Sequence, residues 1–376
     1  MNDASERIAY GRIPLMAAAM AALLIALWAG LARLGVEVPP IRPTLPLAHG
    51  PLMVCGFLGT LISLERAVAL GARWSYAAPA LTAAGALALI AGLPDPAGPL
   101  LIALGSAGLV ANFIVIVRRQ TAPFTITMGL GAAAWLVGNC LWLGGVAITG
   151  MYFWWTAFLV LTIAGERLEL SRLSAVTERS RAMLIAGIGI FIAGLAGASF
   201  STAGLRLAGA GMLAIALWLW RYDLARRTIR QHGLTRFMAV NLLAGYVWLG
   251  AGALAWICFN GDLTTFRYDL MLHTIFLGFV FSMIFAHAPV IFPAVLQRPL
   301  PYRPAFYAHV AILHLSLLIR IGGDLAGSYR LYEVGGILNL VALLVFVANT
   351  AASLARGAAR RSLPSRPAQT AARRAV

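Results

Sequence analysis

The sequence predicts an all-α, polytopic membrane protein built as a bundle of about twelve transmembrane helices. Of its 376 residues, 61% are hydrophobic and only 11% are charged, whereas soluble domains carry about 25% charged residues. Apolar runs long enough to cross a bilayer recur along the whole chain, since roughly 20 apolar residues span the hydrocarbon core as a helix. The net charge of +16 comes from arginines between and after these runs. It therefore indicates a lipid bilayer as partner, and no nucleic acid.

The twelve predicted spans are apolar runs separated by short polar stretches. Two connections, GLPDPAG after the third run and FSTAG after the seventh, are very short, so the helices that they join should be antiparallel neighbours. The predicted spans, in chain order, are 13–35, 46–71, 75–94, 97–117, 124–147, 150–171, 182–200, 203–221, 236–259, 270–296, 303–322 and 330–354.

The arginines predict the orientation. The chain contains no lysine, and an orientation with the N-terminus in the cytoplasm puts 23 of its 29 arginines on the cytoplasmic side. By the positive-inside rule we expect a multi-pass protein of the bacterial inner membrane with both termini cytoplasmic. We expect a transmembrane domain over residues 1–355 and a basic, disordered tail over residues 356–376 that contacts anionic lipid. The acidic N-terminal segment is not expected to be a cleaved signal peptide.

Two histidines lie at matched depth near the outer ends of two predicted helices. His49 opens the second span, and His273 lies near the start of the tenth. The tenth span also carries His287, which is 14 positions further on, about 21 Å along a helix and on nearly the same side. Ionisable side chains inside a membrane mark functional sites by default. The alternative is that His49 and His273 are interfacial side chains hydrogen-bonded to water or to a carbonyl.

The helix count and this histidine pair resemble subunit I of the heme-copper oxidases. In that superfamily a low-spin heme hangs between a histidine of helix two and a histidine of helix ten, which match His49 and His273 here. The stretch HTIFLGFVFSMIF is similar to the segment that follows the helix-ten ligand. The resemblance therefore implies that His49 and His273 hold a heme b.

The chain also departs from the oxidase pattern. Met271 stands where the oxidases have the ligand of a second heme, and the sixth and seventh spans contain no histidine for copper. The resemblance is therefore closer to divergent members such as the NnrS family, which are heme- and copper-binding proteins of nitrogen-oxide metabolism. It implies electron transfer or nitric oxide and nitrite handling without dioxygen reduction, with a quinol or a periplasmic donor as the electron source. A copper site of His49, Met271 and His273 is a second interpretation, because thioether and imidazole groups suit copper.

Three arginines are expected on the outer side against the general trend. Arg42, Arg267 and Arg330 would pair with heme propionates, because arginine–carboxylate pairs are charge-assisted and geometrically specific. Arg330 follows the eleventh span, where the oxidases keep propionate-binding arginines. The alternative is that all three are loop residues that balance nearby acidic side chains.

A deeper polar site is also predicted. His287 and His314 lie at similar depth in the tenth and eleventh spans and are candidates for a second metal or substrate site. Pro289, two residues after His287, should kink its helix. The alternative is that both histidines are hydrogen-bonded core residues.

The second and sixth spans both end in a Glu-Arg doublet, Glu65-Arg66 and Glu166-Arg167. We interpret the doublets as salt bridges at the inner interface, or alternatively as a proton entry point. If the protein binds no heme, the doublets together with His287 and His314 would be the working groups of a transporter or accessory membrane protein.

Overall fold

The structure is a computed structural model that describes residues 3–173, 177–259, 262–296 and 298–362. Within these ranges it is helical and contains no strand, which confirms the predicted all-α class. Helices are expected here because only a helix satisfies every backbone polar group inside a bilayer without a closed barrel.

Helices occupy all twelve predicted spans. The helices and helical segments of the described residues are α1 (Asp3–Arg33), η1 (Leu45–Ala48), α2 (His49–Pro51), η2 (Leu52–Gly59), α3 (Thr60–Leu70), η3 (Arg73–Tyr76), α4 (Ala77–Ala91), α5 (Ala97–Arg119), α6 (Pro123–Leu143), η4 (Ile148–Gly150), α7 (Tyr152–Leu170), η5 (Ser171–Leu173), α8 (Glu178–Ala198), α9 (Thr202–Tyr222), α10 (Ala225–Thr228), α11 (Gly233–Phe259), α12 (Thr265–His273), η6 (Thr274–Phe281), α13 (Ser282–Leu296), α14 (Phe306–Ala326) and α15 (Tyr329–Ser362).

Eleven helical stretches among the described residues are long and apolar enough to cross a membrane. Two of them, Leu45–Leu70 and Thr265–Leu296, are built from several successive segments. The remaining predicted span, α7, is 19 residues long and carries three charged residues near its end. The protein is therefore a polytopic helical bundle.

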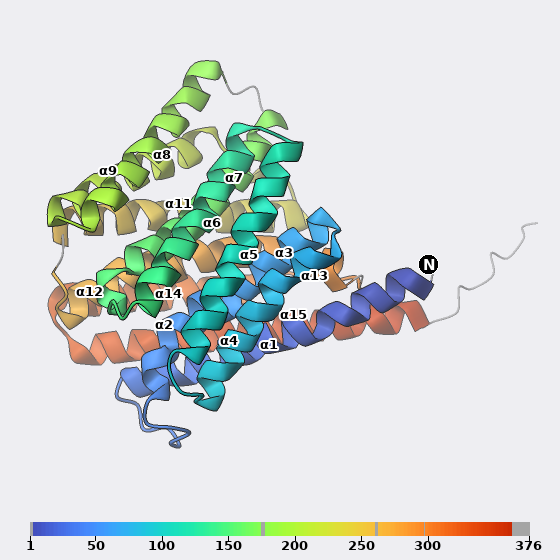
Figure 1. Cartoon of the computed structure of the whole chain (residues 1–376), viewed down its shortest axis with the longest axis horizontal. Helices are drawn as coiled ribbons and strands as arrows, with labels where there is room; N and C mark the ends of the chain where they lie inside the picture. Colours follow the sequence, from blue (N-terminus) through green and yellow to red (C-terminus); the bar gives the residue numbers. More distant parts are fainter. Residues whose placement is uncertain (1–2, 174–176, 260–261, 297, 363–376) are drawn as a thin grey trace, which may run out of the picture.

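Helices that follow one another in the chain pack against each other. The pairs α4 with α5 and α8 with α9 are in contact, which confirms the two antiparallel pairs predicted from short connections. In Figure 1, α1 and α15 lie side by side and extend past the other helices at the end that carries the N-terminus. Both helices cross the bundle. The last residue of α1, Arg33, and the first residue of α15, Tyr329, therefore lie at the end of the bundle opposite the N-terminus.

Glycines allow the closest of these contacts. A Cβ on Gly194 or on Gly211 would lie less than 2.5 Å from the backbone of the facing helix, α9 or α8, so α8 and α9 approach at backbone distance as small residues permit in membranes. Large apolar side chains such as Leu217 and Leu315 lie exposed on the outside of the bundle, as contact with lipid requires.

Helix α15 extends past the last predicted span. The tail is predicted to begin at residue 356, and α15 continues to Ser362. The helix continues because the segment ARGAARRS contains good helix formers and no proline. The rest of the predicted tail, residues 363–376, lies outside the described residues.

Candidate functional site: a two-histidine cavity

A cavity of about 940 Å³ lies at the end of the bundle opposite the N-terminus. The C-terminal part of α1, the start of the second span, the start of α7 and the helices α12, α14 and α15 surround it. Both His49 and His273 line it. Its volume falls within the range of small-molecule and cofactor sites, about 300–1,000 Å³. The structure thus brings the two predicted histidines to one space.

His49 is held by helix α1. Its Nδ1 lies 2.7 Å from the carbonyl oxygen of Ala26. A carbonyl only accepts, so Nδ1 carries the hydrogen and Nε2 carries the lone pair of the neutral ring. A Cβ on Gly30, one turn further along α1, would lie 3.0 Å from the His49 ring. The glycine therefore makes the room that the imidazole occupies.

His273 is held by its own helix. Its Nδ1 lies 3.0 Å from Oδ1 of Asp269 and 3.1 Å from the backbone oxygen of Asp269, one turn earlier in α12. Both partners accept, so this ring also presents Nε2 as its acceptor nitrogen. No described residue hydrogen-bonds to Nε2 of either histidine. Histidines that bind metals almost always donate the other ring N–H in this way.

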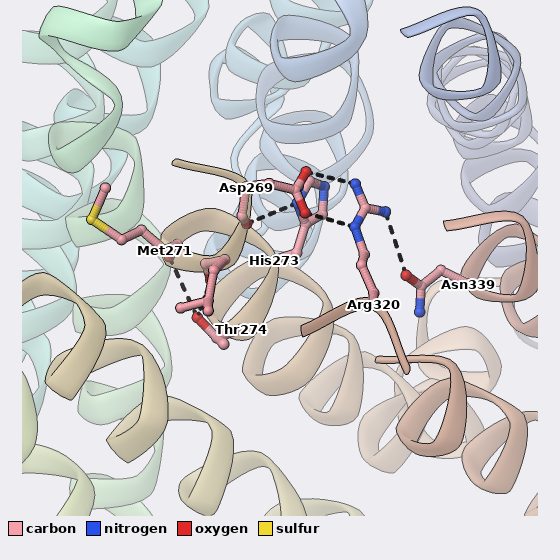
Figure 2. Close-up of polar contacts among 7 residues, drawn as sticks. Asp269, Met271, His273, Thr274, Arg320 and Asn339 are labelled. Carbon is pink, nitrogen blue, oxygen red and sulfur yellow. Dashed lines mark hydrogen bonds and ion pairs between the residues drawn. The ribbon is translucent and has the colours of Figure 1, made fainter. Parts of the chain in front are cut away.

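Asp269 also anchors a buried ion pair. The Arg320 side chain from α14 donates Nε to Oδ2 at 2.7 Å and Nη2 to Oδ1 at 2.6 Å. Figure 2 shows His273, Asp269 and Arg320 in one connected group. The side chains of Asp269 and Arg320 are only 9% and 8% exposed. A pair removed from water in this way is stable only with good hydrogen-bond geometry, which the two parallel bonds provide.

Helix α15 completes this group. Nη1 of Arg320 lies 3.4 Å from Oδ1 of Asn339, whose Nδ2 donates to Ser316 at 2.6 Å. A Cβ on Gly335 would lie 2.5 Å from the backbone nitrogen of Arg320, so only a glycine lets α15 approach α14 this closely. His273 is thereby fixed through α12, α14 and α15 together.

Both histidines lie within three residues of the start of a π-helical segment of eight residues. The segment η2 begins three residues after His49, and η6 begins one residue after His273. The aromatic rings of Phe57 and Phe281, one from each segment, stack with centroids 6.2 Å apart. π-Helical turns inside α-helices occur frequently at functional sites. No pattern in the sequence predicts these segments.

The predicted outer arginines do not line the cavity. Arg42 donates to the carbonyl of Leu89 at 2.5 Å, Arg267 forms an ion pair with Asp262, and Arg330 is exposed at the start of α15. The cations that line the cavity are Arg33 and Arg320 instead. Sequence reasoning missed Arg320, although an arginine inside an apolar span is itself a signal of a polar site.

Met271 also lies apart from the histidine pair. It is fully buried and is not among the residues that line the cavity. In Figure 2 its side chain points away from the group of Asp269, His273 and Arg320. The structure therefore does not bring Met271 together with His49 and His273.

The Glu-Arg doublets meet at the other end of the bundle. Arg66 lies 3.2 Å from Glu65 and also pairs with Glu166 of the other doublet. Arg167 donates to Nε2 of His287 at 2.8 Å. We call these five residues the inner cluster. It confirms the predicted salt bridges and adds a partner, His287, that was predicted for another site.

His287 and His314 are not joined. The Nδ1 of His287 donates to the carbonyl of Met283 at 2.6 Å, so Arg167 and this carbonyl use both of its nitrogens. Nδ1 of His314 accepts from Trp248 at 2.9 Å, and its Nε2 is buried without a partner. No hydrogen bond or ring contact connects the two histidines in the described part of the chain. Over the same residues no group of three histidine, cysteine, aspartate or glutamate side chains is arranged to hold a metal ion.

These features define a polytopic α-helical membrane protein with a histidine-containing polar cavity at one end and a charged cluster at the other. The chain belongs to the family described as "Domain of unknown function (DUF8744)", whose model matches residues 12–355. This range includes every helix that lines the cavity and all of the inner cluster. No curated protein matches the sequence.

Proposed function

We propose that this protein is a membrane heme protein that holds one heme b between His49 and His273. The observation that carries the proposal is that two imidazoles from separate helices line one cavity, each with Nδ1 bound to an acceptor and with no described residue bonded to Nε2. Heme iron with two axial imidazoles is a common protein redox centre. The role that fits this ligand set is electron transfer or the handling of nitrogen oxides.

The remaining walls of the cavity fit the group. The aromatic side chains of Tyr152, Trp155 and Tyr268 supply apolar surface suited to a flat macrocycle. Arg33 supplies positive charge for a propionate, whereas Arg320 is already paired with Asp269. Among the residues that the structure describes, Arg33 has no ion-pair partner, so its guanidinium is available for a bound carboxylate.

The protein's own residues would bind, orient and shield the cofactor. The bonds of His49 to Ala26 and of His273 to Asp269 fix the tautomer of each ring, which leaves the lone pair on Nε2. The apolar part of the wall would limit the contact of the group with water, which lowers the local dielectric constant and affects the reduction potential. When bound, the heme supplies a centre for one-electron transfer and for binding of small ligands.

A second candidate function, transport of protons or of a small substrate, is favoured by the inner cluster. Partly buried Glu65, Arg66 and Glu166 lie within a helical bundle, and intramembrane charges often mark ion pathways. Every member of this cluster has a partner within it. The same pairing would also serve a purely structural role, in which the cluster holds the helices together.

The test is an optical spectrum of the purified, detergent-solubilised full chain, oxidised and then reduced with dithionite, with metal analysis of the same sample. We expect one heme per chain and a sharp reduced α-band that is absent from the double variant His49→Ala/His273→Ala. The variant His232→Ala is the control, because His232 is exposed in the loop before α11. A colourless wild-type protein after expression with ample heme would refute the proposal, and copper in that sample would favour a copper protein.

A further inference from the structure

The two histidines of the cavity differ in what accepts their Nδ1 hydrogen, and this difference extends the proposed function, on which the following inference rests. His49 donates to a neutral backbone carbonyl at 2.7 Å. His273 donates to the Asp269 carboxylate at 3.0 Å, in addition to a backbone carbonyl. The same nitrogen of the same ring type therefore faces a neutral acceptor in one case and an anionic acceptor in the other.

Arg320 holds Asp269 in its charged form. Its guanidinium is permanently protonated and donates two hydrogen bonds to the carboxylate. Water has little access, because the side chains of both partners are less than 10% exposed. His273 is consequently the side chain whose Nδ1–H faces a fixed, desolvated anion.

A carboxylate acceptor makes a histidine a stronger metal ligand. The hydrogen bond draws the Nδ1 proton toward the oxygen and raises the basicity of Nε2. The two rings also differ in how firmly they are held in place. His273 is connected through Asp269 and Arg320 to α14 and α15, whereas the His49 ring is held by a hydrogen bond to α1. We propose that His273 is the permanent iron ligand and His49 the exchangeable one, so that a small external ligand such as nitric oxide replaces His49.

The experiment compares His49→Gly with His273→Gly in the full chain, measuring heme per chain and the carbon monoxide difference spectrum. We expect His49→Gly to retain heme, to bind carbon monoxide, and to regain the low-spin spectrum when imidazole is added. We expect His273→Gly to lose most of its heme. Equal losses, or heme retained only in His273→Gly, would overturn the inference while leaving the proposed function intact.

The role of Asp269 has its own readout. Asp269→Asn should weaken heme binding by about 10–100-fold, as changes behind a metal ligand typically do, and should raise the reduction potential. Asp262→Asn is the matched control, since it breaks the other arginine–aspartate pair at this end of the bundle without touching a histidine. If Asp269→Asn fails to fold, Asp269→Asn/Arg320→Gln removes both buried charges together. Unchanged heme affinity in that double variant would contradict the role of Asp269.

The two proposals fail in different ways. A wild-type protein without heme would refute the proposed function and this inference with it. A wild-type protein with heme whose His49→Gly and His273→Gly variants behave alike would refute this inference alone.

Discussion

The cavity and the inner cluster use the same side-chain types, but they differ in what those side chains leave free. His49 and His273 line a space of about 940 Å³, and no residue in the described part of the chain hydrogen-bonds to Nε2 of either ring. In the inner cluster, Arg167 and the carbonyl of Met283 use both nitrogens of His287. A histidine inside a membrane bundle is thus a candidate ligand when its second nitrogen is free and it lines a cavity, and part of a structural network when both nitrogens are used.

The largest expected effect separates the two regions directly. His49→Ala/His273→Ala should abolish heme binding, whereas His287→Ala should leave heme per chain unchanged, because the nitrogens of His287 serve Arg167 and Met283. The measurement is heme per chain in the purified proteins. Loss of heme in His287→Ala would show that the cofactor contacts the inner cluster, and the comparison would fail.

Asp269→Asn should also lower stability strongly. It leaves the buried guanidinium of Arg320 without its anion, and breaking a buried ion pair from one side costs about 3–5 kcal/mol. Asp269→Asn/Arg320→Gln should cost less, because the buried guanidinium is removed together with its anion. Thermal unfolding in detergent measures both, and equal destabilisation of the two variants would contradict the argument.

Arg66→Gln tests the inner cluster in the same way. It leaves Glu65 and Glu166 facing each other without a cation, and we expect a loss of about 1–2 kcal/mol because partial exposure of these side chains screens the pair. Heme content should stay at the wild-type value. A fall in heme content without a fall in melting temperature would indicate that the two regions are coupled.

Gly30→Ala should disturb the cavity while leaving the rest of the fold intact. The new Cβ would lie 3.0 Å from the His49 ring, so the imidazole must shift, at a cost of about 1 kcal/mol at the low end of overpacking effects. We expect reduced heme content. Gly11→Ala on the same helix is the control, because no atom lies within 4 Å of its Cβ position.

The smallest effect is expected at the exposed pair of Asp262 and Arg267. A hydrogen bond from the backbone N–H of Thr264 lowers the pKa of Asp262. Its contribution to stability is therefore present above the unfolded pKa and is lost as the pH falls through the folded pKa. Because the carboxylate is solvent-exposed, Asp262→Asn should not change the melting temperature measurably at pH 7. A clear destabilisation would show that this loop supports the cavity.

The sequence predicts much of the fold because a bilayer imposes a minimum length and an apolar composition on each span. It also predicts that His49 and His273 lie at one end of the bundle, since helix order alone sets their depth. The orientation in the membrane stays a prediction based on the arginines.

The polar partners of these histidines could not be predicted as well, because they depend on packing between helices distant in sequence. No sequence pattern singles out Asp269, which contacts His273 one turn away and pairs with Arg320, 51 positions further along the chain. Likewise, the doublets suggested salt bridges, but not that Arg66 would pair with Glu166. The π-helical segments η2 and η6 follow no sequence rule that we could apply.

The central claim is that His49 and His273 face one iron, and electron paramagnetic resonance of the oxidised wild-type protein, with heme per chain measured on the same sample, tests it most directly. We predict one heme per chain and a low-spin ferric signal typical of two imidazole ligands. A high-spin signal, a copper signal or a sample without heme would contradict the account.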